Sequence, residues 1–424
     1  MQTAIASARG GSAASANSLA KRYIIAWALA LVFYFLEYAA RSSPAVMIPQ
    51  LSTAFGATAV GVSAIIGTYY YTYSVTNLVA GVALDRTGGK WVIAIGAFVL
   101  AAGCFGFAVS NSLAANLGRL LQGAGSAFAF TGAVYLATHG FSARRLATAI
   151  GVTQCLGMLG GWAGQSVVGP MIHREVPWQT IWNVLGAASL LTGLFLFIVT
   201  PADKRPASQP STAHSSLLRP YGIVFSNLQS YLCGLVGGLL FVPTTVGAMI
   251  WGVAFFQKDL AFSFPAAVTT ASMVPLGWVV GCPLLGWLAD RVGRRKPPLI
   301  WGAVIMLLAM TQLAYLPALM PAQLTAFIFG IASGAAMIPY TIIKEANPDE
   351  VKGSATGAIN FLVFAVTAVI GPVFARFVGK GFETGDHIGH FRSGASFWIV
   401  CILVAIVLSF LLRETGHARR PSPA

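Results

Sequence analysis

The sequence predicts an all-α membrane protein, with twelve transmembrane helices in two six-helix bundles and both termini in the cytoplasm. Three observations indicate this fold class. Of the 424 residues, 56% are hydrophobic and only 9% are charged, whereas soluble domains have about 25% charged residues. The apolar residues form long blocks, and about 20 of them are enough to cross a bilayer as a helix. Short motifs also recur in the two halves of the chain.

Twelve apolar blocks have the length of a membrane span. They cover residues 23–47, 59–83, 91–110, 113–138, 146–171, 178–199, 228–256, 264–288, 297–318, 321–343, 354–377 and 395–413. A segment rich in Pro, Ser and charge separates the first six from the last six. We therefore expect a flexible cytoplasmic tail at 1–22, an N-terminal bundle at 23–199, a cytoplasmic linker at 200–227, a C-terminal bundle at 228–413 and a cytoplasmic tail at 414–424.

The basic residues predict the orientation of these helices. With the N-terminus inside, 18 of the 26 Lys and Arg residues fall on the cytoplasmic side, five on the opposite side and three within spans or at their ends. Cytoplasmic loops of membrane proteins are enriched in Lys and Arg. The asymmetry therefore places both termini in the cytoplasm, and it also accounts for the net charge of +14 without a nucleic-acid partner.

Nothing in the sequence indicates a metal, a cofactor or an enzyme. The five cysteines lie far apart in apolar blocks, as small buried residues do, at Cys104, Cys155, Cys233, Cys282 and Cys401. No phosphate-binding loop that would hydrolyse ATP is present. The spans also lack the clustered titratable groups that a membrane-embedded enzyme would need, and the tails are too short for the output domain of a receptor.

Two pairs of motifs recur at nearly the same offset. The loop after the second block reads GVALDRTGGK from Gly81, and the loop after the eighth reads GWLADRVGRR from Gly286, 205 residues later. Gly169-Pro170 and Gly371-Pro372 are 202 residues apart. The repetition predicts a duplicated six-helix unit. Parallel repeats of this kind pack as two bundles, with the binding site between them.

These loops resemble a signature of the major facilitator superfamily, G-x-L-A-D-R-x-G-R-R. The second copy matches it fully. The first keeps Gly81, Asp85, Arg86, Gly88 and a basic residue at Lys90, and its departures include Ala83 and Gly89. A further signature, R-x-x-Q-G, is present from Arg119 to Gly123. The resemblance implies that the loops gate the transporter, through Gly81, Asp85, Arg86, Gly88, Gly286, Asp290, Arg291 and Gly293. It also implies that each loop aspartate meets a helix N-terminus of the opposite bundle.

Two other stretches resemble the anion-transporting branches of that superfamily. The first comprises Glu37 to Pro44 followed by Tyr69 to Ser74, and the second runs from Gly353 to Phe361. Phagosomal nutrient transporters, which move neutral solutes, are also similar. The resemblance implies a secondary active transporter of a small organic anion, such as a carboxylate or sugar acid, working by alternating access with proton symport. We expect a monomer in the bacterial cytoplasmic (inner) membrane, with the solute, protons and lipid as its partners.

Glu37 is the only acidic residue well inside a predicted helix. A charge at the bilayer centre costs several kcal/mol, on the order of 3 or more, so such a residue is a functional candidate. We predict that Glu37 binds the coupling proton. The alternative is a static ion pair that holds the helices together.

Two arginines are candidate partners for Glu37. Arg41 lies four residues along the same helix, a spacing at which side chains interact, and Arg119 lies at a similar depth on the fourth span. We predict that Arg119 pairs with Glu37 and that Arg41 binds the solute, because a guanidinium binds carboxylate with two parallel hydrogen bonds. The alternative for Arg41 is that its side chain extends to the outer interface.

The remaining candidate solute ligands are polar or aromatic. The resemblance to anion transporters favours Tyr73, Gln154 and Asn360, although amides in membrane bundles also bond neighbouring helices. Trp251 and Tyr340 complete the predicted site.

A proton-coupled drug or metabolite efflux antiporter is the main alternative function. Its signature on the fifth helix, G-x-x-x-G-P-x-x-G-G, is not matched by the sequence from Gly157 to Ile172. A phosphate-linked antiporter would use a deep Arg from each half, and the second half has none.

Overall fold

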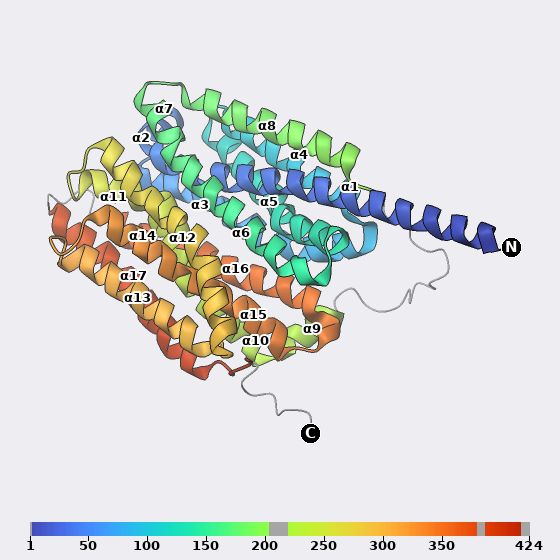
Figure 1. The fold of residues 1–424 in the computed structure, drawn as a ribbon. Coiled ribbons are helices and arrows are strands. Elements are labelled where there is room, and N and C mark those ends of the chain that lie inside the picture. The colour runs from blue at the N-terminus through green and yellow to red at the C-terminus, as the bar shows by residue number, and fades with distance from the viewer. Residues whose placement is uncertain (1, 203–218, 380–385, 417–424) are drawn as a thin grey trace.

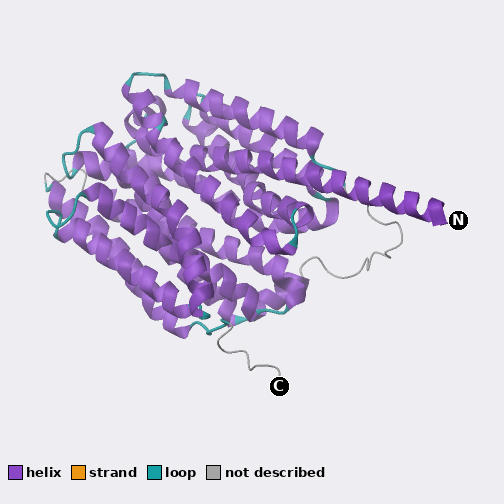
Figure 2. Ribbon diagram, in the orientation of Figure 1, coloured by secondary structure: helices purple, strands orange, loops and turns teal. Residues whose placement is uncertain are grey.

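The computed structural model describes residues 2–202, 219–379 and 386–416, and the described chain folds almost entirely into helices (Figure 2). Residues 203–218 of the predicted linker and 417–424 of the predicted C-terminal tail lie outside the described residues. The first helix begins at Gln2, so most of the range predicted as a flexible tail is helical. Its Ala-rich sequence explains the difference, because Ala has the highest helix propensity.

The N-terminal half contains eight helices and one 3₁₀ turn. In chain order they are α1 (Gln2–Ser42), η1 (Ser43–Val46), α2 (Ile48–Phe55), α3 (Ala59–Thr87), α4 (Gly89–Phe107), α5 (Ser112–Gly140), α6 (Ala143–Ser166), α7 (Val168–His173) and α8 (Trp178–Val199).

The C-terminal half follows the short helix α9 (Arg219–Ser226). Its elements are α10 (Leu228–Val242), η2 (Pro243–Trp251), α11 (Gly252–Lys258), α12 (Phe264–Val292), α13 (Lys296–Tyr315), α14 (Ala322–Ser333), η3 (Gly334–Met337), α15 (Ile338–Ala346), η4 (Asp349–Val351), α16 (Lys352–Gly379) and α17 (His387–Leu411). The segment η2 is a π-helix that begins at Pro243. Proline explains the change of winding, since it has no N–H to continue the α-helical ladder.

Helices occupy all the ranges predicted as spans, but they differ in hydropathy. Ten helical stretches among the described residues are long and apolar enough to cross a membrane, and the bent pair of α2 and α3 would make eleven. The Gly-rich α6 is not among them. The protein is therefore an all-helical membrane protein, and the exact number of twelve spans remains a prediction.

The same packing arrangement occurs in both halves (Figure 1). In the N-terminal half α3 packs on α5, α4 on α8 and α1 on α6, and in the C-terminal half α12 packs on α14, α13 on α17 and α10 on α16. Across the junction α3 meets α16, and α12 meets α6. The matched pairs agree with the repeat that the sequence motifs predict. The start of α1 and the end of α17 lie at one end of the bundle, here called the terminal face; the other end is the distal face (Figure 1).

Side chains join the two halves along this junction. Ser74 Oγ donates to the carbonyl of Phe361 at 2.8 Å, and Gln165 Nε2 donates to the carbonyl of Ala248 at 3.0 Å. Nearer the terminal face, the Tyr221 hydroxyl on α9 donates to the carbonyl of Leu78 at 2.9 Å. Any solute pathway between the halves must therefore open through these contacts.

Candidate functional site

The centre of the molecule contains a buried ion pair whose two residues lie one helical turn apart. Glu37 and Arg41 lie at i and i+4 on α1, and both side chains are fully buried. Arg41 Nη2 donates to Glu37 Oε1, and the Tyr69 hydroxyl from α3 donates to the same oxygen. Arg41 Nη2 and Nε also lie 2.9 and 3.3 Å from the Tyr69 hydroxyl. One tyrosine thus joins both charges across two helices.

Aromatic rings surround the guanidinium of Arg41. Its Cζ lies 4.2 Å from the ring centroid of Tyr38, 4.6 Å from Tyr73 and 5.2 Å from Phe364. Rings within about 6 Å of a cation attract it through their electron-rich faces. Phe364 belongs to α16, so the cation lies at the junction of the two halves. With 1% of its surface exposed, Arg41 does not extend to the outer interface.

Each member of the pair keeps one polar atom without a hydrogen-bond partner among the described residues. These atoms are Glu37 Oε2 and Arg41 Nη1, and both are buried. A buried polar group without a partner costs about 1–3 kcal/mol, and more when it is charged. The site therefore has one free acceptor and one free donor nitrogen with which a solute group could bond.

The predicted pairing of Glu37 with Arg119 is wrong. Arg119 Nη1 donates to Gln122 Oε1 at 2.6 Å and to the carbonyl of Ala40 at 3.2 Å. Its Nε and Nη2 both lie 3.2 Å from the carbonyl of Ile66. These backbone acceptors come from α1 and α3, so Arg119 ties three helices together. Arg119 is therefore not the hydrogen-bond partner of the Glu37 carboxylate.

A small central cavity lies beside the ion pair. Its volume is about 10 Å³, roughly the room that one water molecule needs. Ten residues from both halves line it: Tyr34, Tyr38, Tyr73, Phe130, Gln154, Phe241, Met337, Tyr340, Asn360 and Phe364. Four predicted ligands, Tyr73, Gln154, Tyr340 and Asn360, are thus brought together around one cavity. Its size requires the halves to move apart before a solute can enter.

The polar groups of this cavity are already bonded to one another. The Tyr34 hydroxyl donates to Gln154 Oε1 at 3.2 Å, and the Tyr340 hydroxyl donates to Asn360 Oδ1 at 2.7 Å. Asn360 Nδ2 also lies 3.3 Å from Asn77 Oδ1 on the opposite half. In this structure the two amides therefore bond neighbouring helices, and their role as solute ligands remains a prediction.

Sequence reasoning missed three residues and misplaced one. The missed residues are Tyr34, Tyr38 and Asn77. Tyr34 and Tyr38 lie seven and three residues before Arg41, a spacing that places all three on one face of α1 and that is visible in the sequence. Asn77 lies one helical turn beyond Tyr73. Trp251 does not reach the central cavity. It lines a separate pocket toward the distal face with Tyr70 and Pro372, because the π-helical turn of η2 carries it past the centre.

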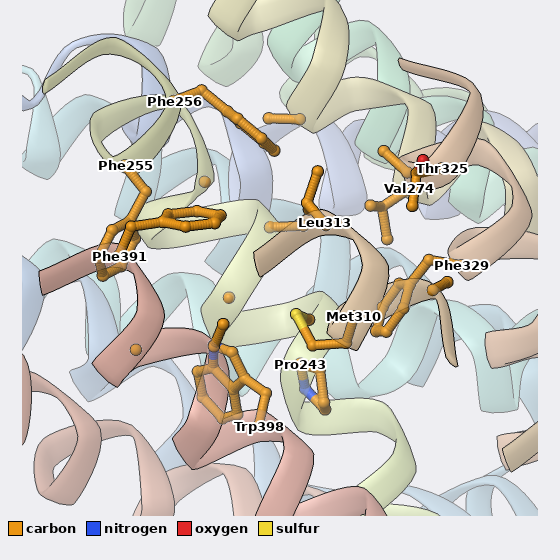
Figure 3. A pocket seen from close by; sticks show the side chains of 18 residues that line it. Pro243, Phe255, Phe256, Val274, Met310, Leu313, Thr325, Phe329, Phe391 and Trp398 are labelled. Atoms are coloured by element: carbon orange, nitrogen blue, oxygen red, sulfur yellow. The ribbon is translucent and has the colours of Figure 1, made fainter. Parts of the chain in front are cut away.

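A second cavity lies inside the C-terminal half and is almost purely apolar (Figure 3). Its volume is about 70 Å³, and Pro243, Phe255, Met310, Phe329 and Trp398 are among the side chains that line it. Thr325 and Trp398 are its only lining side chains with an O–H or N–H group, and none of its lining side chains is charged. The polar central cavity is therefore the better candidate for solute recognition.

A larger pocket of about 200 Å³ lies toward the terminal face. The motif glycine Gly81 lines it together with Gly353 and Gly357 from α16. Phe130 lines both this pocket and the central cavity, and its ring packs 5.5 Å from that of Tyr34. Phe130 therefore separates the centre from the terminal face.

The second copy of the repeated loop forms a network of charges. Arg295 Nη1 lies 2.6 Å from Asp290 Oδ1, and its Nη2 lies 2.8 Å from Glu345 Oε1. The partner of Asp290 is thus in its own half, which differs from the predicted contact with the opposite bundle. The Asp290 side chain is 70% exposed, and the guanidinium of Arg295, five residues along the chain, is within reach to bond it. The side chain of Asp85 in the first copy lies outside the described residues.

Two motif glycines end their helices in conformations that favour glycine. Gly88 follows α3 with φ of +76°, and Gly293 follows α12 with φ of +67°. Other side chains rarely adopt these angles. The glycines therefore turn the chain sharply into α4 and α13, while Arg86 and Arg291 remain exposed beside them.

Comparison with known proteins supports a transporter. A D-xylose transporter of Levilactobacillus brevis is 30% identical over 157 residues, which are 37% of this chain and only 33% of that relative's own length. The membrane sensor protein UhpC of Salmonella typhimurium (strain LT2) is 23% identical over 427 residues, covering 92% of this chain and 90% of the relative.

The fold is shared with a solved structure. The bacterial homologue of the human lysosomal transporter Spinster, in an inward-facing and unoccupied conformation, matches with a TM-score of 0.74 and 15% identity over 95% of this chain and 99% of that one. The sequence profile of the Major Facilitator Superfamily matches residues 30–372. The chain therefore belongs to the Major Facilitator Superfamily and is an integral membrane transporter rather than an enzyme.

Proposed function

We propose that this transporter moves a small organic anion, such as a carboxylate or sugar acid, together with a proton by alternating access. One observation supports this most directly: Arg41 is buried against Glu37 at the junction of the halves and keeps Nη1 free of hydrogen bonds. A guanidinium with free N–H groups binds a carboxylate strongly and in a fixed geometry.

Charge balance supplies the coupling. With the site empty, Glu37 neutralises Arg41. Counted over Glu37, Arg41 and the solute, a bound anion without a proton would leave one net negative charge, and a bound proton without an anion would leave one net positive charge. Each state costs several kcal/mol, on the order of 3 or more. When both bind, protonated Glu37 is neutral, and Arg41 is balanced by the anion, so proton and solute favour each other's binding.

A neutral sugar is the second candidate. The central cavity is lined by hydroxyl and amide groups without an ionised side chain of its own, and such groups suit a polyhydroxylated solute. The likeness to a D-xylose transporter favours this class as well. In this case the ion pair would stay intact, and binding would not depend on Arg41.

A ligand panel on the purified protein separates the two candidates. It contains monocarboxylates, sugar acids, pentoses, hexoses and cationic drugs, and it is run on wild type, Arg41→Ala and the control Arg145→Ala, which removes an exposed Arg of the same half. A ligand at 100 times its Kd adds about 2.7 kcal/mol of stability. The proposal expects a carboxylate to stabilise wild type and Arg145→Ala but not Arg41→Ala.

Flux into proteoliposomes then tests transport itself. Uptake of the stabilising acid should rise with an inward proton gradient and fall in Glu37→Gln. Stabilisation by sugars alone, retained in Arg41→Ala, would replace the anion proposal with the neutral one. Binding without flux would indicate a sensor, as the name of the Salmonella relative suggests for that protein.

A further inference from the structure

A buried histidine and aspartate meet at the distal face of the C-terminal half, far from Glu37 along the chain and in a different bundle. Asp259 directly follows α11, and His390 lies in the first turn of α17. They are 4% and 6% exposed. Titratable side chains are rarely buried in proteins unless they are paired, and these two are paired with each other.

The hydrogen bonds of His390 define where its protons lie. Nε2 is 2.8 Å from the carbonyl oxygen of Val378 on α16. A carbonyl only accepts, so Nε2 must bear a hydrogen. Nδ1 is 2.7 Å from Asp259 Oδ2, which requires a second proton between these two atoms. It lies either on Nδ1, giving an imidazolium and a carboxylate, or on Oδ2, giving two neutral groups.

Loss of this shared proton would be costly. The lone pair of Nδ1 would then face a carboxylate oxygen at hydrogen-bond distance, and a net negative charge would stay buried. Burial raises the pKa of Asp259, and the hydrogen bonds and charges of His390 and then His387 offset this only in part. The ring of Phe255 stacks on His390 at 5.2 Å and helps to exclude water.

Among the residues that the structure describes, the other charged groups nearby do not take the place of His390. His387 Nδ1 lies 3.5 Å from Asp259 Oδ1 on the exposed side, and its side chain is 55% exposed. Lys258 and Arg376 are exposed on α11 and α16. On α17, Asp386 accepts from the backbone N–H of Gly389 at 2.9 Å, and Arg392 donates to the carbonyl of Ala314 at 3.3 Å.

We infer that Asp259 and His390 form a second proton-binding site, which holds the ends of α11, α16 and α17 together while it is protonated. Because α16 packs against α3 across the junction, release of this proton at alkaline pH loosens the distal end of the C-terminal half. The inference does not depend on the identity of the solute or on the role of Glu37.

Thermal unfolding between about pH 5 and about pH 9, the range in which histidines titrate, tests the site. Wild type should lose stability toward alkaline pH, with a fall in the unfolding midpoint of about 3 °C or more. Asp259→Asn and His390→Gln should each lower the midpoint and flatten this pH dependence. His387→Gln, which removes the exposed histidine beside Asp259, should keep it. An alkaline step that disappears in His387→Gln and persists in His390→Gln would overturn the inference.

A second measurement uses the wild-type chain and does not depend on the variants folding. In ¹⁵N-histidine NMR spectra, one imidazole should keep an unchanged pattern across the pH range in which the exposed histidines change theirs, and Glu37→Gln should not alter it. If all histidines titrate together near about pH 6.5, no such site exists. The Glu37→Gln spectrum also separates failure of this site from failure of the proposed solute coupling.

Discussion

A double-mutant cycle on Glu37 and Arg41 tests the central ion pair most directly. Glu37→Gln removes the negative charge with little change of volume, and Arg41→Met keeps most of the apolar stem of the arginine. Both side chains are fully buried, and removal of one partner from such a pair costs about 3–5 kcal/mol because the other charge stays buried alone. Removal of both charges leaves no such charge.

The double variant should therefore be more stable than the sum of the single costs predicts, by about 2 kcal/mol or more. The two single variants should also differ in their response to pH. In Arg41→Met the lone carboxyl of Glu37 can bind a proton, so the loss of unfolding free energy in this variant should become smaller toward acidic pH. In Glu37→Gln the guanidinium cannot lose its proton in a protein, so its cost should be constant.

The assay is unfolding in detergent, monitored across the acidic range for wild type, both single variants and the double variant. Gln122→Ala is a suitable control, because it removes a partner of Arg119 and not of the pair. Strictly additive costs would refute the reasoning, since they would mean that the two charges do not stabilise each other. Equal pH dependence of the single variants would refute the assignment of the titrating group.

Substitutions at three other residues test the packing, the pocket boundary and the acid dependence of the fold. Gly125→Ala would place a Cβ 2.5 Å from the carbonyl oxygen of Gly96 and force α4 from α5, at a cost of about 1–3 kcal/mol in unfolding, whereas the control Gly151→Ala meets open space. Phe130→Ala should join the central cavity to the terminal pocket and let protons leak without solute, measured as acidification of proteoliposomes. Burial raises the pKa of the Glu414 carboxyl, but hydrogen bonds from backbone N–H groups at the start of α13 outweigh burial and lower the pKa overall. The carboxylate therefore stabilises the fold above about pH 4.3, and this contribution is lost as the pH falls. Glu414→Gln should lose about 0.5–2 kcal/mol at neutral pH and lack that acidic fall in its unfolding curve.

The sequence contained enough to predict the helices and four of the ten residues that line the central cavity. Regular spacing explains this success, because Tyr73, Gln154 and Asn360 lie on helices whose apolar length is plain in the sequence. The choice between Arg41 and Arg119 could not be made in the same way. It depends on the carbonyl groups of Ala40 and Ile66, and backbone acceptors leave no mark in a sequence.

The buried histidine was missed for a related reason. The last apolar block was predicted to begin at residue 395, but α17 begins at His387. Its first two turns are not strongly apolar, so the hydropathy pattern assigned His390 to a loop. The fold buries it because Asp259 and the Val378 carbonyl satisfy both ring nitrogens, and such long-range partners become evident only in three dimensions.

The charge balance around Arg41 links the identity of the solute to the coupling of transport. Under the proposed function, an anion would displace Glu37 as the counter-ion of Arg41, and a proton on Glu37 would then keep the charge of the pair and its solute balanced. A neutral sugar leaves the pair as it is, and its binding gives Glu37 no reason to change protonation. The number of protons moved per solute is therefore a measurement of which group contacts Arg41. A stoichiometry of about one proton per anion agrees with an exchange of counter-ions, whereas proton-coupled uptake of a neutral sugar would require a carboxyl other than Glu37.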